Sequence, residues 1–111
     1  MKRTRRHRYI LFQIRSEQEY IWITQKELIH ELQKAIYPQL SKRTIDVGLW
    51  VVRFDGTTGI IKSLHSETER VKQLLLSLNT IGGKHVMVTT LATSGTIRGL
   101  SKKKEQHMDR Y

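Results

Sequence analysis

The sequence has no cysteine, which excludes disulfide bonds and thiolate metal sites and is compatible with a reducing compartment. It also has no apolar run close to the ~20 residues that a membrane-spanning helix needs. The amino terminus is basic like the start of a signal peptide, but the apolar run that follows, residues 9–12, is too short for one. We therefore expect a cytoplasmic protein that does not meet a membrane, with its 111 residues in one domain.

The sequence also contains few of the residue patterns that form catalytic or metal-binding sites. The five histidines show no metal-ligand spacing, and there is neither a Gly-x-Ser-x-Gly motif nor a cysteine nucleophile. Glu27 and Glu69 fit helix capping boxes and Asp55 fits a turn, so Asp46 has no second carboxylate for acid–base catalysis. Gly82-Gly83-Lys84 lacks the spacing of a phosphate-binding loop and is interpreted as a helix stop. We expect no catalytic residue, no metal and no cofactor held by the chain itself.

Acidic residues are outnumbered, and the excess positive charge lies at the two ends of the chain. There are 20 basic and 10 acidic residues, for a net charge of +10; residues 1–16 carry +6, residues 98–111 carry +3 and the rest only +1. Arg, which predominates in residues 1–16, forks onto phosphate with two parallel hydrogen bonds. Basic ends on a nearly neutral body indicate a nucleic-acid ligand, and a solvated tail that aids solubility is the alternative. The candidate RNA-binding residues are Arg3, Arg5, Arg6, Arg8, Arg98, Lys102, Lys103 and Lys104.

Hydrophobic spacing predicts four strands and two helices. The predicted elements are strands over 8–15 and 85–93, helices over 24–37 and 66–79, and a hairpin over 44–63. A capping box of Thr24 and Glu27 begins the first helix, and Pro38 is expected to end it. A second capping box over residues 66–69 begins the other helix.

The order β-α-β-β-α-β predicts an α+β, ferredoxin-like sandwich. In this fold a four-stranded antiparallel sheet carries two helices on one face, and its other face stays open for function. Residues 1–7 are assigned to a basic amino-terminal arm, 8–100 to the ferredoxin-like domain and 101–111 to a basic carboxy-terminal tail.

The predicted hairpin is apolar on both faces. With a two-residue turn at Asp55-Gly56, one face carries Trp50, Val52, Phe54 and Ile61, and the other carries Leu49, Val51 and Ile60 beside Arg53 and Lys62. A free-standing hairpin is expected to be polar on one side, so the second face is predicted to meet a partner. The candidate partner interface is Leu11, Leu49, Val51, Arg53, Ile60 and Lys62. The alternative is that the pairing slips by one residue and the carboxy-terminal segment covers this face.

An aromatic platform for RNA bases is not expected on the two central strands. RNA-binding domains of this type stack bases on such aromatics, but residues 59–62 of the third strand contain none. Tyr9 and Phe12 of the first strand lie on opposite faces, so only one can face outward. RNA binding is therefore predicted to be electrostatic.

Three segments together resemble a known family: Arg8-Tyr9-Ile10-Leu11-Phe12, the hairpin over 48–62, and Thr93-Ser94-Gly95-Thr96-Ile97-Arg98. They are similar to the archaeal ribonuclease P protein component 2 family, in order, over roughly residues 5–100. That family has the ferredoxin-like fold predicted above. The Arg-Tyr-Ile-Leu start and the Ser-Gly-Thr-Ile-Arg segment are the most specific parts of this resemblance. Arg98 ends the second of them and is the first choice for an RNA contact; a helix or turn cap near backbone carbonyls is its alternative role.

The resemblance implies a subunit of a ribonucleoprotein that removes the 5′ leader from precursor tRNA. RNA carries out the catalysis there, with Mg²⁺ at the RNA. The implied partners are ribonuclease P RNA, precursor tRNA, ribonuclease P protein component 3 and the other ribonuclease P proteins. The alternatives are a non-catalytic protein–protein adaptor, another RNA-binding module of ferredoxin-like fold and, by analogy of fold alone, a small-ligand sensor.

Overall fold

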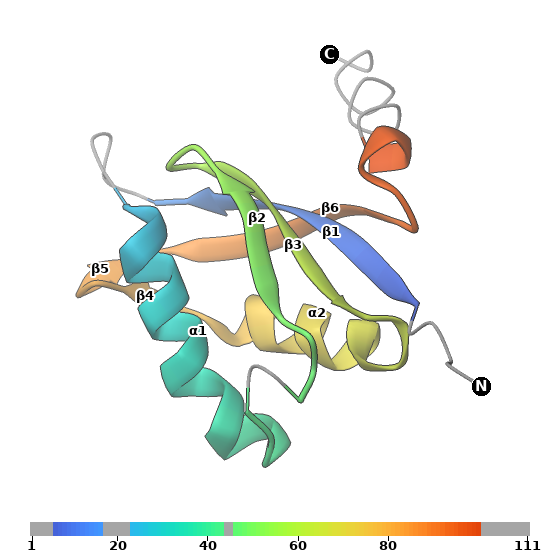
Figure 1. Ribbon diagram of the computed structural model, residues 1–111. Helices are drawn as coiled ribbons and strands as arrows, with labels where there is room; N and C mark the ends of the chain where they lie inside the picture. Colours follow the sequence, from blue (N-terminus) through green and yellow to red (C-terminus); the bar gives the residue numbers. More distant parts are fainter. Residues whose placement is uncertain (1–5, 17–22, 44–45, 101–111) are drawn as a thin grey trace.

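The computed structural model describes residues 6–16, 23–43 and 46–100, which form a four-stranded sheet packed against two helices and a separate two-stranded sheet (Figure 1). The elements are β1 (His7–Arg15), α1 (Gln25–Leu40), β2 (Trp50–Phe54), β3 (Thr58–Leu64), the 3-10 turn η1 (His65–Glu67), α2 (Thr68–Ser77), β4 (Thr80–Ile81), β5 (Lys84–His85) and β6 (Met87–Ser94). The main sheet is antiparallel with the order β2-β3-β1-β6. The predicted ferredoxin-like arrangement is confirmed.

The main core lies between the sheet and the helices, and strand alternation decides which residues enter it. Ile10, Phe12 and Ile14 of β1 are buried in one cluster with the apolar stripes of α1 and α2. The residues between them, Leu11 and Gln13, point to the other face of the sheet because side chains alternate along a strand. Here that other face is called the open face.

Helix α1 begins as the sequence predicts but ends later. The Glu27 backbone N–H donates to Thr24 Oγ1 at 3.1 Å, and the Thr24 N–H donates to Glu27 Oε1 at 3.0 Å, so the capping box forms. Pro38 does not stop the helix, which runs on to Leu40. A proline in the last turn removes only its own N–H from the helix, and the Ser41 N–H closes the end on the Tyr37 carbonyl.

Two other local predictions are wrong. The second capping box does not form, because α2 follows directly after η1 and its first turn has no side-chain cap. Glu67, the last residue of η1, forms an ion pair with Lys42. Gly82-Gly83 does not stop the helix either. Both glycines have positive φ (58° and 77°) and form the turn between β4 and β5, a conformation that two consecutive glycines adopt without strain.

The β2–β3 hairpin has a longer turn and a bulge. Phe54 pairs with Gly59 and Val51 with Ile61, and the register shifts between Val51 and Arg53. Gly59 leaves room for the Phe12 ring beside it, since a Cβ there would lie 2.6 Å from that ring. Phe12 and Phe54 therefore stack across Gly59, with their centroids 5.9 Å apart. The bulge sends Phe54 into the core while Arg53 stays at the surface.

Candidate nucleic-acid interface

The open face is partly covered by the segment that follows β6. Leu100 is buried against Leu11 and Ile60 in a second, smaller cluster. In Figure 1 this turn lies on the side of the sheet opposite α1 and α2. Complete burial of one leucine contributes roughly 1.5–3 kcal/mol, so this contact holds the turn against the sheet. The alternative prediction, that the carboxy-terminal segment covers this face, is confirmed for residues 97–100.

Residues 94–100 are shaped by two side-chain caps and one glycine. Ser94 Oγ accepts the Thr96 N–H at 3.3 Å, and Thr96 Oγ1 accepts the Gly99 N–H at 3.0 Å, which caps the helical turn that starts at Ile97. A Cβ at Gly99 would overlap Ser94 Oγ. These contacts give the Ser-Gly-Thr-Ile-Arg-Gly segment a structural role: it turns the chain back so that Leu100 reaches the open face.

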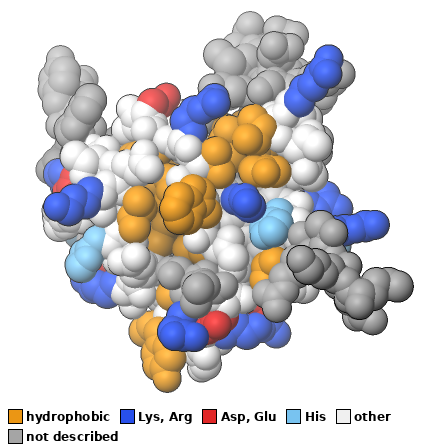
Figure 2. Space-filling view, viewed as in Figure 1, with side chains coloured by type: hydrophobic (Ala, Val, Ile, Leu, Met, Phe, Trp, Pro, Cys, Tyr) orange, Lys and Arg blue, Asp and Glu red, His pale blue; other side chains and the backbone are white. Residues whose placement is uncertain are grey.

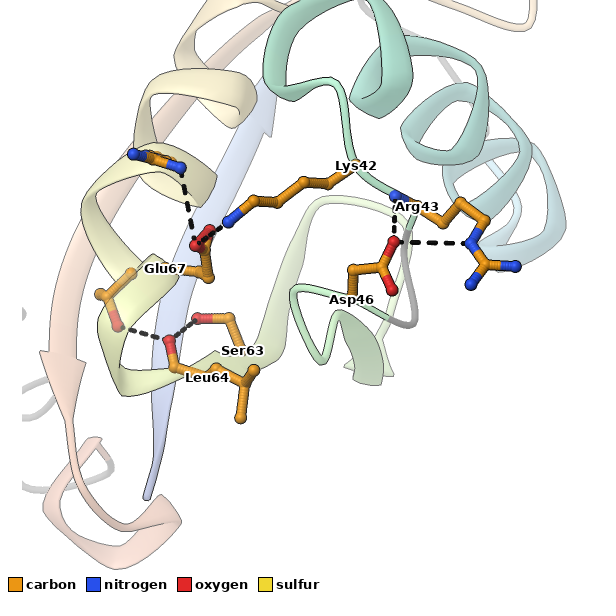
Figure 3. Close-up of polar contacts among 8 residues, drawn as sticks. Lys42, Arg43, Asp46, Ser63, Leu64 and Glu67 are labelled. Carbon is orange, nitrogen blue, oxygen red and sulfur yellow. Dashed lines mark hydrogen bonds and ion pairs between the residues drawn. The ribbon is translucent and has the colours of Figure 1, made fainter. Parts of the chain in front are cut away.

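The acidic side chains of the helix layer are already paired with cations. Glu67 Oε1 lies 2.6 Å from Lys42 Nζ (Figure 3). It also lies 3.7 Å from Arg70 Nη1. The other ion pairs among the described residues join Glu27 to Lys84, Glu31 to Lys34, Asp46 to Arg43 and Glu69 to Lys72. The helix layer and its loops therefore carry largely compensated charge.

Hydrogen bonds to these carboxylates lower two pKa values. The backbone N–H of Thr24, followed by the Lys84 side chain, lowers the pKa of Glu27 below its ordinary value. The backbone N–H of Arg43 is the main cause of the lowered pKa of Asp46, and the Arg43 guanidinium adds to it. Both groups are thereby held as anions that neutralise neighbouring cations.

The cations without an acid partner are concentrated on the sheet. Among the described residues, seven Lys and Arg side chains have no carboxylate within ion-pair distance: Arg6, Arg8, Arg15, Lys26, Arg53, Lys62 and Arg98. Only Lys26 belongs to a helix of the helix layer; the others lie on or beside β1, β2 and β3 or in the turn after β6. In Figure 2, Lys and Arg side chains lie beside the hydrophobic side chains gathered near the middle of the view. The uncompensated positive charge thus belongs to the sheet and the turn that crosses it.

Arg8 is held by a histidine that sequence reasoning did not select. Arg8 Nε donates to His65 Nδ1 at 2.9 Å, and the His65 backbone N–H donates to the Arg6 carbonyl at 2.8 Å. His65 Nδ1 therefore orients the guanidinium of Arg8 through its Nε. The two terminal amino groups of Arg8 stay available for a bidentate contact with an oxyanion.

Three of the predicted RNA-binding residues, Arg6, Arg8 and Arg98, lie within the described residues. All three lack an acid partner there, and Arg98 is exposed with no hydrogen bond that would make it a cap. Tyr9 pairs with Ser94, so the segment leading to Arg98 starts beside the Arg8 end of β1. The other predicted residues lie outside the described residues: Arg3, Arg5, Lys102, Lys103 and Lys104.

The predicted partner interface divides between the two faces. Leu11 and Ile60 face the open side but are buried beneath Leu100, and Arg53 and Lys62 stay accessible at its border. Leu49 and Val51 pack on the helix side, so their placement on the open face was wrong. The bulge after Val51 is the physical reason, because one extra residue moves the preceding side chains to the other face.

Trp50, like Val52 in the same strand, lies on a different face from Phe54 and Ile61, contrary to the prediction. It was expected beside Phe54 and Ile61, which are core residues, but it is 68% exposed and pairs with Lys62 on β3. Lys62 in turn pairs with Tyr9 on β1. A tryptophan in the hairpin was visible in the sequence as a candidate functional residue. The face of the sheet on which it lies depends on the bulge in β2, which the sequence did not reveal.

No metal centre is formed by the part of the chain that the structure describes, where no three His, Asp or Glu side chains gather. No helix in these ranges is both long and apolar enough to cross a bilayer. What the arrangement offers chemically is a set of fixed cations beside apolar and aromatic side chains.

Comparisons with known proteins identify the family and the fold of this chain. The model of the Rpp14/Pop5 family matches residues 8–104. Ribonuclease P protein component 2 of Pyrococcus abyssi is 31% identical over 100 residues, covering 88% of this chain and 83% of that protein. The protein of the same name from Archaeoglobus fulgidus is 30% identical over 98 residues, covering 88% and 87%. A chain in a cryo-EM structure of yeast ribonuclease MRP has the same fold, with a TM-score of 0.66 at 15% identity and 100% of both chains covered.

Proposed function

This chain belongs to the Rpp14/Pop5 family, and from that membership we propose that it is a protein subunit of ribonuclease P, the ribonucleoprotein that removes the 5′ leader from precursor tRNA. The observation that carries the mechanism is the separation of charge. Among the described residues, every cation of the helix layer except Lys26 is matched by a carboxylate, whereas those of the sheet and of the turn after β6 are not. A surface of unmatched cations is the electrostatic complement of an RNA backbone.

The proposed role is phosphate neutralisation rather than catalysis. Arg6, Arg8 and Arg98, together with the basic residues of the two ends, screen phosphates where RNA strands crowd. This lowers the Mg²⁺ concentration that the catalytic RNA needs to hold its fold, and the Mg²⁺ belongs to the RNA. In this proposal the chain itself supplies no catalytic residue and no cofactor site. The proposal also assigns the complete enzyme to the cytoplasm.

The protein partners in this proposal are ribonuclease P protein component 3 and the other subunits of the enzyme. A role as an adaptor that uses the open face alone is less well supported. That face would need a free apolar surface, but Leu11 and Ile60 are already buried beneath Leu100. Arg53 and Lys62 border it as accessible cations, which suits RNA or an acidic protein surface.

Reconstitution tests the proposal. Cleavage of precursor tRNA by the cognate RNA is measured at low Mg²⁺ with the full chain, with Arg98→Ala, and with Lys72→Ala, whose side chain is already paired with Glu69. The full chain and Lys72→Ala are expected to stimulate cleavage, and Arg98→Ala less so. The plot of log affinity against log salt should become shallower by about 1 for Arg98→Ala. Affinity that does not change with salt would contradict the electrostatic account.

A further inference from the structure

Three side chains form a row across the open face, one on each of three adjacent strands. Trp50 of β2 lies opposite Lys62 of β3, and Lys62 lies opposite Tyr9 of β1. Directly opposed residues in antiparallel strands project from the same face. Neighbouring strands are about 4.8 Å apart, so the three side chains originate within roughly 10 Å of one another.

The row combines an exposed aromatic ring with a cation that no carboxylate neutralises. Trp50 is 68% exposed. Tryptophan is highly buried on average in folded proteins, so such exposure is unusual for a residue that serves only the fold. Lys62 has no ion-pair partner among the described residues, and Tyr9 is half-buried against the Leu100 cluster. Arg53, also without an acid partner, pairs with Ile60 two residues along β3 from Lys62.

A surface of this kind fits a single-stranded nucleotide better than a duplex. A base has an apolar face that stacks on an indole ring, and its phosphate meets a neighbouring cation, which is how single strands are bound without sequence preference. In an RNA duplex the faces of the bases are buried in the stack and only the edges and the backbone are accessible. Trp50 lies on β2, the edge strand of the main sheet, where it also borders the groove between α1 and β2.

We infer that the Trp50–Lys62–Tyr9 row binds an unpaired nucleotide of RNA, with the base on the Trp50 indole and the phosphate on Lys62. The inference rests on the proposed role in binding RNA and adds an aromatic contact to it. It also departs from the sequence-based expectation of purely electrostatic binding. Tyr9 forms the end of the row on β1. Arg53 offers a second cation for the next phosphate of the RNA strand.

The test uses the full chain with Trp22→Phe, which leaves Trp50 as its only tryptophan. Titration with a short oligouridylate should quench Trp50 fluorescence, whereas an abasic ribose-phosphate oligomer of equal length should bind with little quenching. Trp50→Ala should weaken oligouridylate binding about 5- to 150-fold, the range expected for one stacked base. Trp50→Phe should recover part of the loss. Leu76→Ala, an exposed apolar residue on α2, is the matched control and should change nothing.

The dependence of affinity on salt separates stacking from electrostatics. Trp50→Ala should lower affinity without changing the slope against log salt, because stacking releases no counterions. Lys62→Ala should make the slope shallower by about 0.7, the value for one contact with a single strand. If Trp50→Ala leaves affinity unchanged while binding still falls with salt, the row is not a nucleotide site, and Trp50 would instead serve a protein partner. If binding does not depend on salt at all, the proposed electrostatic function fails as well.

Discussion

Lys42 Nζ lies 2.6 Å from Glu67 Oε1, and this contact joins the segment after α1 to the turn that begins α2 (Figure 3). The second oxygen, Glu67 Oε2, is buried and has no hydrogen-bond partner among the described residues. The loss of hydration of this buried carboxylate is compensated only by the cations beside it. Its charged form is therefore stable only while those cations stay in place.

Replacing this carboxylate should lower stability. We expect Glu67→Gln to reduce the free energy of unfolding by about 1.5–3 kcal/mol, the range for a hydrogen bond to a charged group. Urea unfolding measures the change. Glu69→Gln is the control, since the Glu69 side chain is 82% exposed and its pair with Lys72 spans 3.5 Å. It should cost less than about 0.5 kcal/mol, and equal losses in both variants would disprove the special role of Glu67.

Gly99→Ala should loosen the turn from the open face. The added Cβ would meet Ser94 Oγ, so this hydroxyl has to leave the Thr96 N–H, and we expect the turn to loosen and Leu100 to lose part of its contact with Leu11 and Ile60. Overpacking of this kind costs about 1–3 kcal/mol. Gly95→Ala is a matched control, because no atom lies within 4 Å of a Cβ at that position. Amide hydrogen exchange over residues 96–100 should speed up for Gly99→Ala alone; unchanged exchange would show that the turn is held in another way.

The two glycines of the β4–β5 turn should differ when each is replaced by alanine. Both have positive φ, so both substitutions carry a strain of about 1 kcal/mol. A Cβ at Gly82 would also displace the Glu27 carboxylate from Thr24 and Lys84, whereas nothing lies within 4 Å at Gly83. We expect Gly82→Ala to be the more destabilising by about 1 kcal/mol. In a Glu27→Ala background the difference should disappear, and its persistence would locate the cost elsewhere.

Stability should fall at acid pH partly through Glu27. Its pKa is lowered below the ordinary value of 4.5, first by the Thr24 backbone N–H and then by Lys84. The folded state therefore binds fewer protons than the unfolded state, and the stabilisation is present above pH 4.5 and is lost as the pH falls toward the folded pKa. The free energy of unfolding of Glu27→Gln should depend less on pH below 4.5 than that of the unchanged protein.

Asp46→Asn provides an independent comparison for this pH dependence. The pKa of Asp46 is also lowered, mainly by the Arg43 backbone N–H, and it interacts with partners different from those of Glu27. The two substitutions should therefore reduce the acid sensitivity additively. A double variant whose stability falls with acid as steeply as that of the unchanged protein would show that other groups control this range.

Local patterns in the sequence determined the elements and the fold class. Alternation over residues 8–15 predicted β1, the Thr24 and Glu27 spacing predicted the start of α1, and the order of elements predicted the four-stranded sheet with two helices. These features depend on contacts within a few residues, or on the single face that an amphipathic element must bury. The uneven distribution of charge along the chain also indicated a polyanion ligand, because that inference needs only the order of the residues.

Only the tertiary structure decided which side chains reach each face of the sheet. Phe54 enters the core because Phe12, far away in the sequence, stacks on it across Gly59, and the bulge in β2 accommodates that contact. The same bulge sends Val51 inward and leaves Trp50 opposite Lys62. A one-residue change of register reverses every side chain of a strand, and no pattern within the strand reveals it. The composition of the candidate site was therefore set by contacts between segments that are distant in the chain.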